Sequence, residues 1–403
     1  MTEQKKKLLV LSSTYPRWKD DWEPAFVHEL SKRLTDEFDV TVLCPREKDS
    51  KRKEIREGVN IHRYRYAPNH LSTLVSNGGI TSNIKANRLK WLLVSLFLPA
   101  QIIATWSTIR RLNPDAIHCH WIIPQGICLI IARLLLRKKP PILLTSHGGD
   151  LYTFNGKIGR RIKKYVLINA DAITVVSEAM REEADQISGR ELEISVIPMG
   201  VDTENLFYPD PTIDRSKSEI LFVGRLVEKK GAKYLIDAFK IVLDSIPEST
   251  LTIVGDGPER QALERQAIEL KIDNRVTFEG SILNKELPHF YRRATVFVAP
   301  FITASNGDQE GLGLVLAEAI SCGCKVISAH TKPAHQLQKI LTNPRQLLTF
   351  NQKSTQELAM KIIKNLTTSE QSYLKANHEN ISQAFSYKNI SSRYIEMLKP
   401  LIR

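Results

Sequence analysis

The sequence has few of the features that define disulfide-rich, zinc-binding or membrane-spanning proteins. Its 403 residues include five cysteines, an odd number without a CxxC pair, which favours reduced cytosolic thiols over a disulfide framework or a zinc site. No uninterrupted apolar run reaches the ~20 residues that a transmembrane helix needs. The basic N-terminus contains only a short apolar run, residues 8–11, so it predicts a first strand rather than a signal peptide.

The whole chain has a net charge of +13, and acidic residues are scarce in one of its segments. Residues 51–139 contain 15 Lys and Arg but only 3 Asp and Glu, so this segment alone has a surplus of 12 positive charges. Such a segment should be attracted to an anionic surface such as a membrane. A merely solvated basic face is the alternative interpretation.

The longest apolar run, residues 91–106, lies inside the same basic segment. It contains Pro99, begins and ends with tryptophan, and is followed by Arg110 and Arg111. Its length falls short of a membrane-spanning helix. A buried core helix and a helix lying at a bilayer interface both fit the pattern.

Two domains are expected because 403 residues exceed what one hydrophobic core usually serves. Short β-branched runs alternate with amphipathic stretches, which is typical of βαβ units and parallel sheets. A polar, proline-bearing stretch over residues 202–219 separates two such alternations. We therefore predict an α/β protein of two Rossmann-like, doubly wound domains facing each other across a cleft. Their predicted bounds are residues 1–205, completed by a C-terminal helix over 386–403, and residues 206–385.

Three strand ends of the second domain carry residues suited to a diphosphate. The segment "FVGRLVEKKG" places Arg225 and Lys230 just after a strand, "VGDGPE" places two glycines after another, and "QEGLGLVLAE" begins a helix. The carboxyl ends of parallel strands meet at one edge of a sheet. Two cations, glycines that permit close backbone approach and a helix N-terminus together form an anion site. This combination predicts a nucleotide-like ligand.

Two glutamates flank this last segment. Glu310 precedes the predicted helix, where its carboxylate can accept hydrogen bonds from sugar hydroxyls, and Glu318, expected two turns into the helix, can accept both donors of a ribose diol. Chance spacing on an exposed helix is the alternative. The backbone amides expected to face the diphosphate are those of Gly311, Leu312, Gly313 and Leu314.

The motifs "GRLVEKKG", "VGDGPE" and "EGLGLVLAEAISCGCKVI" resemble the signature of retaining glycosyltransferases of family 4, which adopt the GT-B fold. The segments "IHCHWIIPQG", "TSHGGD" and "VIPMGVDTENLF" are similar to the N-terminal domain of that family, so the resemblance spans nearly the whole chain. It is specific for the family and weak for the substrate.

The resemblance implies a role for each matching residue. Arg225 and Lys230 would bind the donor diphosphate, Glu310 the sugar hydroxyls, Glu318 the ribose, Gly255 the nucleotide and the backbone near Ile282 its base. His147 matches a histidine that reaches the donor sugar, with a helix-capping or core role as the alternative. The first strand-to-helix loop, residues 13–26, lacks the glycines of many relatives, and residues 331–350 replace the usual glycine-rich loop, so no contact is assigned to either.

The chemistry implied is transfer of a sugar with anomeric retention. Arg225, Lys230 and the helix N-terminus would stabilise the leaving diphosphate, and the departing phosphate would deprotonate the acceptor. Because the chain has no DxD motif, we predict neither a divalent metal nor another cofactor. The pair His118 and His120 could bind a metal, but a packing or cleft-edge role is preferred because no third ligand is apparent.

These observations predict a bacterial, cytoplasmic hexosyltransferase, peripheral at the inner face of the plasma membrane. Its expected partners are a nucleotide sugar, a lipid-linked or saccharide acceptor of surface-polysaccharide or glycolipid assembly, and an anionic membrane surface. A basic helix over residues 155–167 suits such an acceptor or is simply solvated. No nucleic acid is expected, and no oligomeric state is indicated. The alternatives are a transferase acting on a soluble acceptor, a nucleotide-sugar epimerase-like enzyme and a non-catalytic binding protein.

Overall fold

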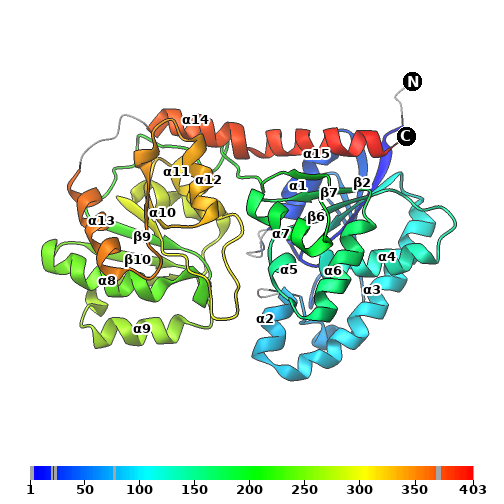
Figure 1. The fold of residues 1–403 in the computed structure, drawn as a ribbon, viewed down its shortest axis with the longest axis horizontal. Coiled ribbons are helices and arrows are strands. Elements are labelled where there is room, and N and C mark those ends of the chain that lie inside the picture. The colour runs from blue at the N-terminus through cyan, green and yellow to red at the C-terminus, as the bar shows by residue number, and fades with distance from the viewer. Residues whose placement is uncertain (1–3, 20, 22–24, 76–78, 369–373, 403) are drawn as a thin grey trace. The chain divides into compact units, whose positions relative to one another are not determined.

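The computed structural model describes residues 4–19, 21, 25–75, 79–368 and 374–402, so part of the first strand-to-helix loop lies outside the described residues. The chain forms two compact units. The N-terminal unit contains Met1–Pro198 together with Ile390–Arg403, and the C-terminal unit contains Met199–Asn389 (Figure 1). Each unit is an α/β domain with its own sheet, as the alternating sequence pattern predicts.

The N-terminal unit contains an eight-stranded sheet in the order β3-β4-β2-β1-β5-β6-β7-β8. All pairings are parallel except that of β3 with β4. The strands are β1 Lys6–Leu11, β2 Phe38–Pro45, β3 Lys53–Arg56, β4 Val59–Tyr64, β5 Ala116–His120, β6 Ile142–Ser146, β7 Ala172–Val175 and β8 Ile194–Val196. The central strands β5 and β6 are buried along their whole length, because helices cover both faces of a parallel sheet.

Helices connect these strands and cover the sheet. They are α1 Phe26–Leu34, α2 Gly79–Ala86, α3 Trp91–Leu112, α4 Ile127–Leu134, α5 Gly149–Tyr152, α6 Lys157–Ile168 and α7 Glu178–Ser188. The last helix, α15 Tyr387–Leu401, completes the unit: its residues Ile390, Tyr394 and Leu398 are buried in the same apolar core as β1 and β2. The sequence prediction of a C-terminal helix that packs on the first domain is consistent with this core.

The C-terminal unit contains a six-stranded, fully parallel sheet in the order β11-β10-β9-β12-β13-β14. Its strands are β9 Glu219–Val223, β10 Thr250–Val254, β11 Val276–Gly280, β12 Val296–Ala299, β13 Lys325–Ala329 and β14 Leu347–Phe350. Its helices are α8 Ala232–Ser245, α9 Arg260–Glu269, α10 Leu287–Arg293, α11 Leu314–Ser321, α12 Lys332–Ile340, α13 Thr355–Thr367 and α14 Leu374–Phe385. Figure 1 shows α8, α9 and α13 on one side of this sheet and α11, α12 and α14 on the other. The unit is therefore doubly wound.

Two predicted helices differ in length from the structure. Helix α3 continues to Leu112, well past the apolar run that ends at Trp106, because the following turn remains helical until Asn113 adopts a left-handed conformation. Helix α11 begins only at Leu314, since Gly313 has a φ of 67°. Glu318 therefore lies one turn into α11 and not two turns, as expected from the sequence.

Candidate active site

The loops after β9 and β10 meet at the carboxyl edge of the C-terminal sheet because glycines remove the side chains that would separate them. A Cβ atom on Gly255 would lie 2.0 Å from the carbonyl oxygen of Gly224. The amide of Gly255 donates to the carbonyl of Gly280 at the end of β11, at 2.7 Å. Three strand ends are thus joined at one place, and Arg225 follows directly after Gly224.

Lys230 and Glu310, predicted separately from two motifs, are bonded to each other. Lys230 Nζ donates to Glu310 Oε2 at 2.7 Å, and each side chain is only 14% exposed. Lys230 Nζ also lies 4.8 Å from the centre of the Phe301 ring, in a cation–π contact. The other carboxylate oxygen of Glu310 accepts from the amide of Gly313 at 3.1 Å. One of the amides predicted to face a diphosphate is therefore bonded to Glu310 in this structure.

The charge of Glu310 is fixed by these contacts. Burial opposes its ionisation, but the ammonium groups of Lys230 and Lys229 and the hydrogen bonds from Lys230 and Gly313 outweigh burial and lower the pKa of Glu310 to about 2. Glu310 is ionised at neutral pH. It can accept hydrogen bonds from hydroxyl groups, but its negative charge would repel a phosphate placed beside it.

Glu318 has a different environment. Tyr291, from α10, donates from its hydroxyl to Glu318 Oε2 at 2.9 Å, and Tyr291 is completely buried. Burial raises the pKa of Glu318 to about 7, against the opposing effects of the Tyr291 hydrogen bond and the charge of Lys230. A change in pH near neutrality thus changes the charge of Glu318 while Glu310 stays ionised.

Ile282, predicted to lie near a base, lines a pocket of about 440 Å³ in the C-terminal unit. The segment before β9 also lines the pocket and includes Tyr208, whose ring centre lies 4.2 Å from the guanidinium carbon of Arg292. The lining residues are Asn205, Leu206, Tyr208, Ile213, Ile282, Lys285, Glu286, Pro288, His289, Phe290 and Arg292. The pocket is open, and it combines apolar and charged side chains.

His147 belongs to the N-terminal unit, where it follows β6. Asp150 holds this turn: its carboxylate accepts from Ser146 Oγ at 2.9 Å, from the His147 amide at 3.3 Å and from the Ile122 amide at 2.6 Å. Burial raises the pKa of Asp150, whereas the hydrogen bonds it accepts act to lower it. The carboxylate thereby ties the end of β6 to the turn after β5.

Aromatic rings surround the His147 side chain. The ring of Phe26 lies 4.8 Å and that of Trp121 5.1 Å from it, between centroids. Trp121 has a φ of 71°, which is rare for a large side chain. Burial lowers the pKa of His147 to about 3, so this imidazole is neutral. A neutral imidazole can donate one hydrogen bond and accept another.

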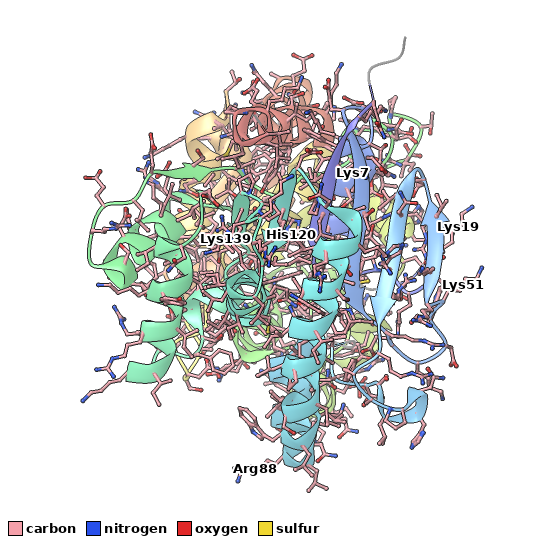
Figure 2. The ribbon with its side chains drawn as sticks, turned by 90° about the vertical axis from the view of Figure 1, so that its right-hand side faces the viewer. Lys7, Lys19, Lys51, Arg88, His120 and Lys139 are labelled. Carbon is pink, nitrogen blue, oxygen red and sulfur yellow. The ribbon has the colours of Figure 1, made fainter. Side chains whose placement is uncertain are left out.

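Helix α3 has one packed and one exposed face. Phe97, Gln101, Thr105, Thr108 and Ile109 are buried, whereas the opposite face exposes Trp91, Leu92, Leu96 and Ile103 by 52–70%. Figure 2 shows α3 along the front of this unit, with Arg88 beyond its lower end. By length and composition the stretch Arg88–Leu112 could cross a membrane, but its buried face packs on its own domain.

No group of three or more His, Cys, Asp or Glu side chains that could hold a metal ion occurs among the described residues. His118 and His120 are both buried in β5. The five cysteines are buried, free thiols.

Two family models together match most of the chain. Residues 25–205 match the model described as Glycosyltransferase Family 4, and residues 207–382 match the model described as Glycosyl transferases group 1. The chain belongs to the family 4 glycosyltransferases. The GT-B fold and the family predicted from its motifs are therefore confirmed.

Relatives of this family 4 chain include a GDP-mannose-dependent α-(1-6)-phosphatidylinositol monomannoside mannosyltransferase from Mycolicibacterium smegmatis, 32% identical over 200 residues. That match covers 47% of the chain and 52% of the relative, so the chain spans about half the length of the mannosyltransferases it matches. A putative teichuronic acid biosynthesis glycosyltransferase, TuaC from Bacillus subtilis, is 27% identical over 386 residues, covering 88% of the chain and 87% of the relative.

Solved structures have the same fold. Sucrose-phosphate synthase from Thermosynechococcus elongatus superposes with a TM-score of 0.76 at 20% identity, covering 98% of the chain and 99% of that structure. HepE from Anabaena, in complex with UDP and glucose, has a TM-score of 0.69 at 20% identity with the same coverage. At this identity the likeness concerns the fold alone.

Sequence reasoning missed three side chains that hold the candidate site residues of this glycosyltransferase. Tyr291 binds Glu318, Phe301 lies under Lys230, and Asp150 organises the turn of His147. Asp150 stands in the motif "TSHGGD", so its spacing from His147 was a usable signal. Tyr291 and Phe301 have no local signal, because their contacts depend on how α10 and β12 pack.

Proposed function

We propose that this protein is a retaining glycosyltransferase that moves a hexose-type sugar from a nucleotide diphosphate to a lipid-linked saccharide acceptor, in surface-polysaccharide or glycolipid assembly. The observation that carries the proposal is the grouping of Lys230 and Glu310 beside glycine-joined strand ends of one sheet. Such an edge is where doubly wound sheets bind ligands. The relatives named for GDP-mannose transfer and teichuronic acid assembly support the same substrate classes.

The donor would bind with its parts distributed along this edge. Its diphosphate would contact Arg225, Lys230 and the amides at the start of α11, and its sugar hydroxyls would contact Glu310. Its ribose would contact Glu318, with the nucleotide against Gly255 and the base near Ile282. Lys230 is paired with Glu310, so in the proposed complex its ammonium group would contact both Glu310 and a phosphate oxygen.

In the proposed reaction the bond between the anomeric carbon and the β-phosphate oxygen breaks, and a bond from the same carbon to an acceptor oxygen forms. The electron pair leaves with the diphosphate, where Arg225 and Lys230 stabilise the added charge. The acceptor proton passes to a phosphate oxygen of the leaving group on the same face of the sugar, which gives retention. His147 would contact the sugar as a neutral imidazole.

A screen of nucleotides tests the donor half of the proposal. Thermal unfolding is measured with UDP, GDP and their hexose conjugates, and the proposed donor should raise the unfolding temperature because it binds the folded state. Glu310→Ala should lose sugar transfer but still bind the bare nucleotide diphosphate, with an affinity reduced only by the loss of the contact that orders Lys230. Transfer by Glu310→Ala at the rate of the natural protein would contradict the assignment.

Product analysis of reactions with the same nucleotide sugars distinguishes the alternatives. Donor turnover without any acceptor would indicate an epimerase-like enzyme. Transfer to water-soluble saccharides in the absence of lipid would indicate a soluble acceptor. The anomeric configuration of the product, measured by proton NMR, decides between retention and inversion.

We further propose that the protein acts at the inner face of the plasma membrane through α3. Four exposed apolar side chains of this helix and the cations Arg88, Arg110 and Arg111 near its ends support this placement. Trp106 lies 5.0 Å from the Arg110 guanidinium, which keeps this cation beside the apolar face. No acidic residue occurs between Arg88 and Leu112.

Co-sedimentation with vesicles tests the membrane proposal. The double substitution Arg110→Glu and Arg111→Glu should weaken binding to phosphatidylglycerol vesicles by at least tenfold, since each basic residue near an anionic surface contributes about 1 kcal/mol. The control is Arg265→Glu with Lys339→Glu, two exposed positions of the C-terminal unit that give the same change in charge. Equal binding by both variants would contradict the proposal.

A further inference from the structure

Three histidines form a buried row inside the N-terminal unit. His118 and His120 point to the same face of β5, and their rings lie 4.2 Å apart between centroids. His120 Nδ1 lies 2.9 Å from His147 Nε2, and these two rings are stacked with an interplanar angle of 16°. Figure 2 places His120 among the strands behind α3. The row therefore leads from the interior of the sheet to the edge where His147 is half-buried.

The inner end of the row is fixed by polar partners. His118 Nε2 lies 2.8 Å from Thr145 Oγ1, which in turn lies 2.6 Å from Thr174 Oγ1. The ring of Tyr394, from α15, is 5.1 Å from that of His118. His118 and His120 are at most 1% exposed. The side chains are thus immobilised by packing and cannot exchange partners with solvent.

The contact between His120 and His147 holds a single proton. Either His120 donates from Nδ1 to His147 Nε2, or His147 donates from Nε2 to His120 Nδ1. In the first case the remaining N–H of the pair is His147 Nδ1–H; in the second it is His120 Nε2–H. Among the described residues neither of these two nitrogens has a hydrogen-bond partner.

The location of that remaining N–H decides between the two cases. A buried N–H without an acceptor is costly, whereas one that faces a ligand-binding edge gains an acceptor when the ligand arrives. Both nitrogens are buried, but they belong to side chains of different exposure: His120 is 1% exposed inside the sheet, whereas His147 is partly exposed at the end of β6, where ligands of such sheets bind. Only the first case places the unsatisfied donor on the side chain that reaches the ligand-binding edge.

We propose that His120 is a positioning residue that donates from Nδ1 to His147 Nε2 and so holds His147 as the tautomer protonated on Nδ1. His147 then presents an N–H to a hydroxyl oxygen of the bound sugar and does not act as a base through Nε2. The identity of that oxygen rests on the proposed sugar-transfer function; the tautomer does not. Burial lowers the pKa of both imidazoles, so both are neutral in the working range of pH.

Nitrogen-15 NMR of the histidine side chains tests the tautomer without substrate. The chain has ten histidines, and the spectrum of His147→Gln assigns the signals of residue 147. We expect His147 Nδ1 to have the shift of a protonated nitrogen and Nε2 that of an unprotonated one. The opposite pair of shifts would overturn the proposal.

Substitutions at His120 test the positioning role. His120→Leu should lower kcat by roughly tenfold, the loss of about one orienting hydrogen bond, with a smaller change in the donor KM. His120→Asn, whose side-chain N–H replaces Nδ1–H, should restore most of kcat and the His147 shifts. His118→Gln is the matched control: it alters the same buried row but should leave the His147 shifts unchanged.

The two proposals can fail separately. If no sugar transfer is detected but His147 carries its proton on Nδ1 and loses that preference in His120→Leu, the proposed function is wrong and the role of His120 stands. If transfer occurs and the His147 shifts are reversed or are insensitive to His120, the positioning role is wrong. Should His120→Leu fail to fold, the shifts of the natural protein and of His120→Asn still decide.

Discussion

Replacing Glu310 by glutamine should destabilise the C-terminal unit and should do so only while the carboxylate is ionised. The pKa of Glu310 is lowered from 4.5 to about 2. At 1.36 kcal/mol for each pH unit, the ionised Glu310 in its folded surroundings, held by Lys230, Lys229 and the Gly313 amide against the cost of burial, contributes about 3 kcal/mol to the free energy of unfolding at neutral pH. The side chains of Glu310 and Lys230 are both 14% exposed, so solvent screens their interaction little.

This estimate predicts a measurable shift in thermal unfolding. For a unit of this size each kcal/mol corresponds to roughly 2–4 °C, so Glu310→Gln should unfold about 6–12 °C below the natural protein. The matched control is Asp308→Asn, which removes the neighbouring pair with Lys229. That pair is longer, at 3.2 Å, and is 24–29% exposed, so its loss should cost less than about 1 kcal/mol.

The dependence on pH has a definite sign. A carboxyl whose pKa is lowered by folding stabilises the protein above its unfolded pKa of 4.5, and this contribution disappears as the pH falls through the folded pKa of about 2. The difference in unfolding free energy between the natural protein and Glu310→Gln should therefore be constant from pH 8 to about 5 and shrink below it.

The assay must report on the C-terminal unit alone. All five tryptophans stand between positions 18 and 121, in the N-terminal unit, so intrinsic tryptophan fluorescence does not follow this transition. Hydrogen exchange of β9, β10 and β12, measured by mass spectrometry across a urea series, follows the unfolding of the C-terminal unit. The reasoning would be refuted if Glu310→Gln lowered the free energy of unfolding of the C-terminal unit no more than Asp308→Asn does. It would also be refuted if the decrease caused by Glu310→Gln were undiminished at pH 3.

Three further predictions concern the same sheet edge. Tyr291→Phe should weaken nucleotide binding about three- to tenfold in calorimetry, through loss of the hydrogen bond to Glu318, while the control Tyr234→Phe should have no effect. Because the raised pKa of Glu318 is about 7, its carboxylate becomes ionised as the pH rises toward 7, and nucleotide binding through a ribose should strengthen by up to ~10-fold per pH unit. Glu318→Gln should abolish this dependence of the affinity on pH. Gly255→Ala should lower the free energy of unfolding by about 3 kcal/mol or more, since its Cβ would lie 2.0 Å from a carbonyl oxygen. The control Gly307→Ala, at a glycine with positive φ but open space around it, should lower it by about 1 kcal/mol. Equal urea midpoints for the two variants would contradict this prediction.

The sequence was sufficient to predict elements that depend on local chemistry. Continuous apolar runs ending in glycine define buried parallel strands, and parallel strands bring their ends to one edge. Lys230 and Glu310 could therefore be assigned to one site although they are 80 residues apart. The sequence pattern does not predict the direct hydrogen bond between Lys230 and Glu310, because that bond requires the loop after β12 to fold back on the loop after β9.

Contacts that depend on packing between elements could not be predicted. The hydroxyl of Tyr291 reaches Glu318 only because α10 and α11 pack side by side. The contact of His120 with His147 depends on the register of β5 and β6, which pairs His120 with Thr145 and leaves His147 just beyond the strand. Alternation along β5 shows that His118 and His120 share a face, but it does not show which residue of the next strand lies opposite.

The pairing of Lys230 with Glu310 bears on how the cation that would bind the diphosphate keeps its position in the site. A lysine with no partner at a protein edge would be mobile, and ordering it on binding would cost conformational entropy. Here Glu310 and the Phe301 ring hold the ammonium group in position. In the proposed complex the phosphate joins an ordered cation, and Glu310 turns its remaining hydrogen-bonding capacity to the sugar hydroxyls. The same contact that stabilises the C-terminal unit would thus prepare both residues for the donor, which is why a substitution at Glu310 should reduce stability and transfer together.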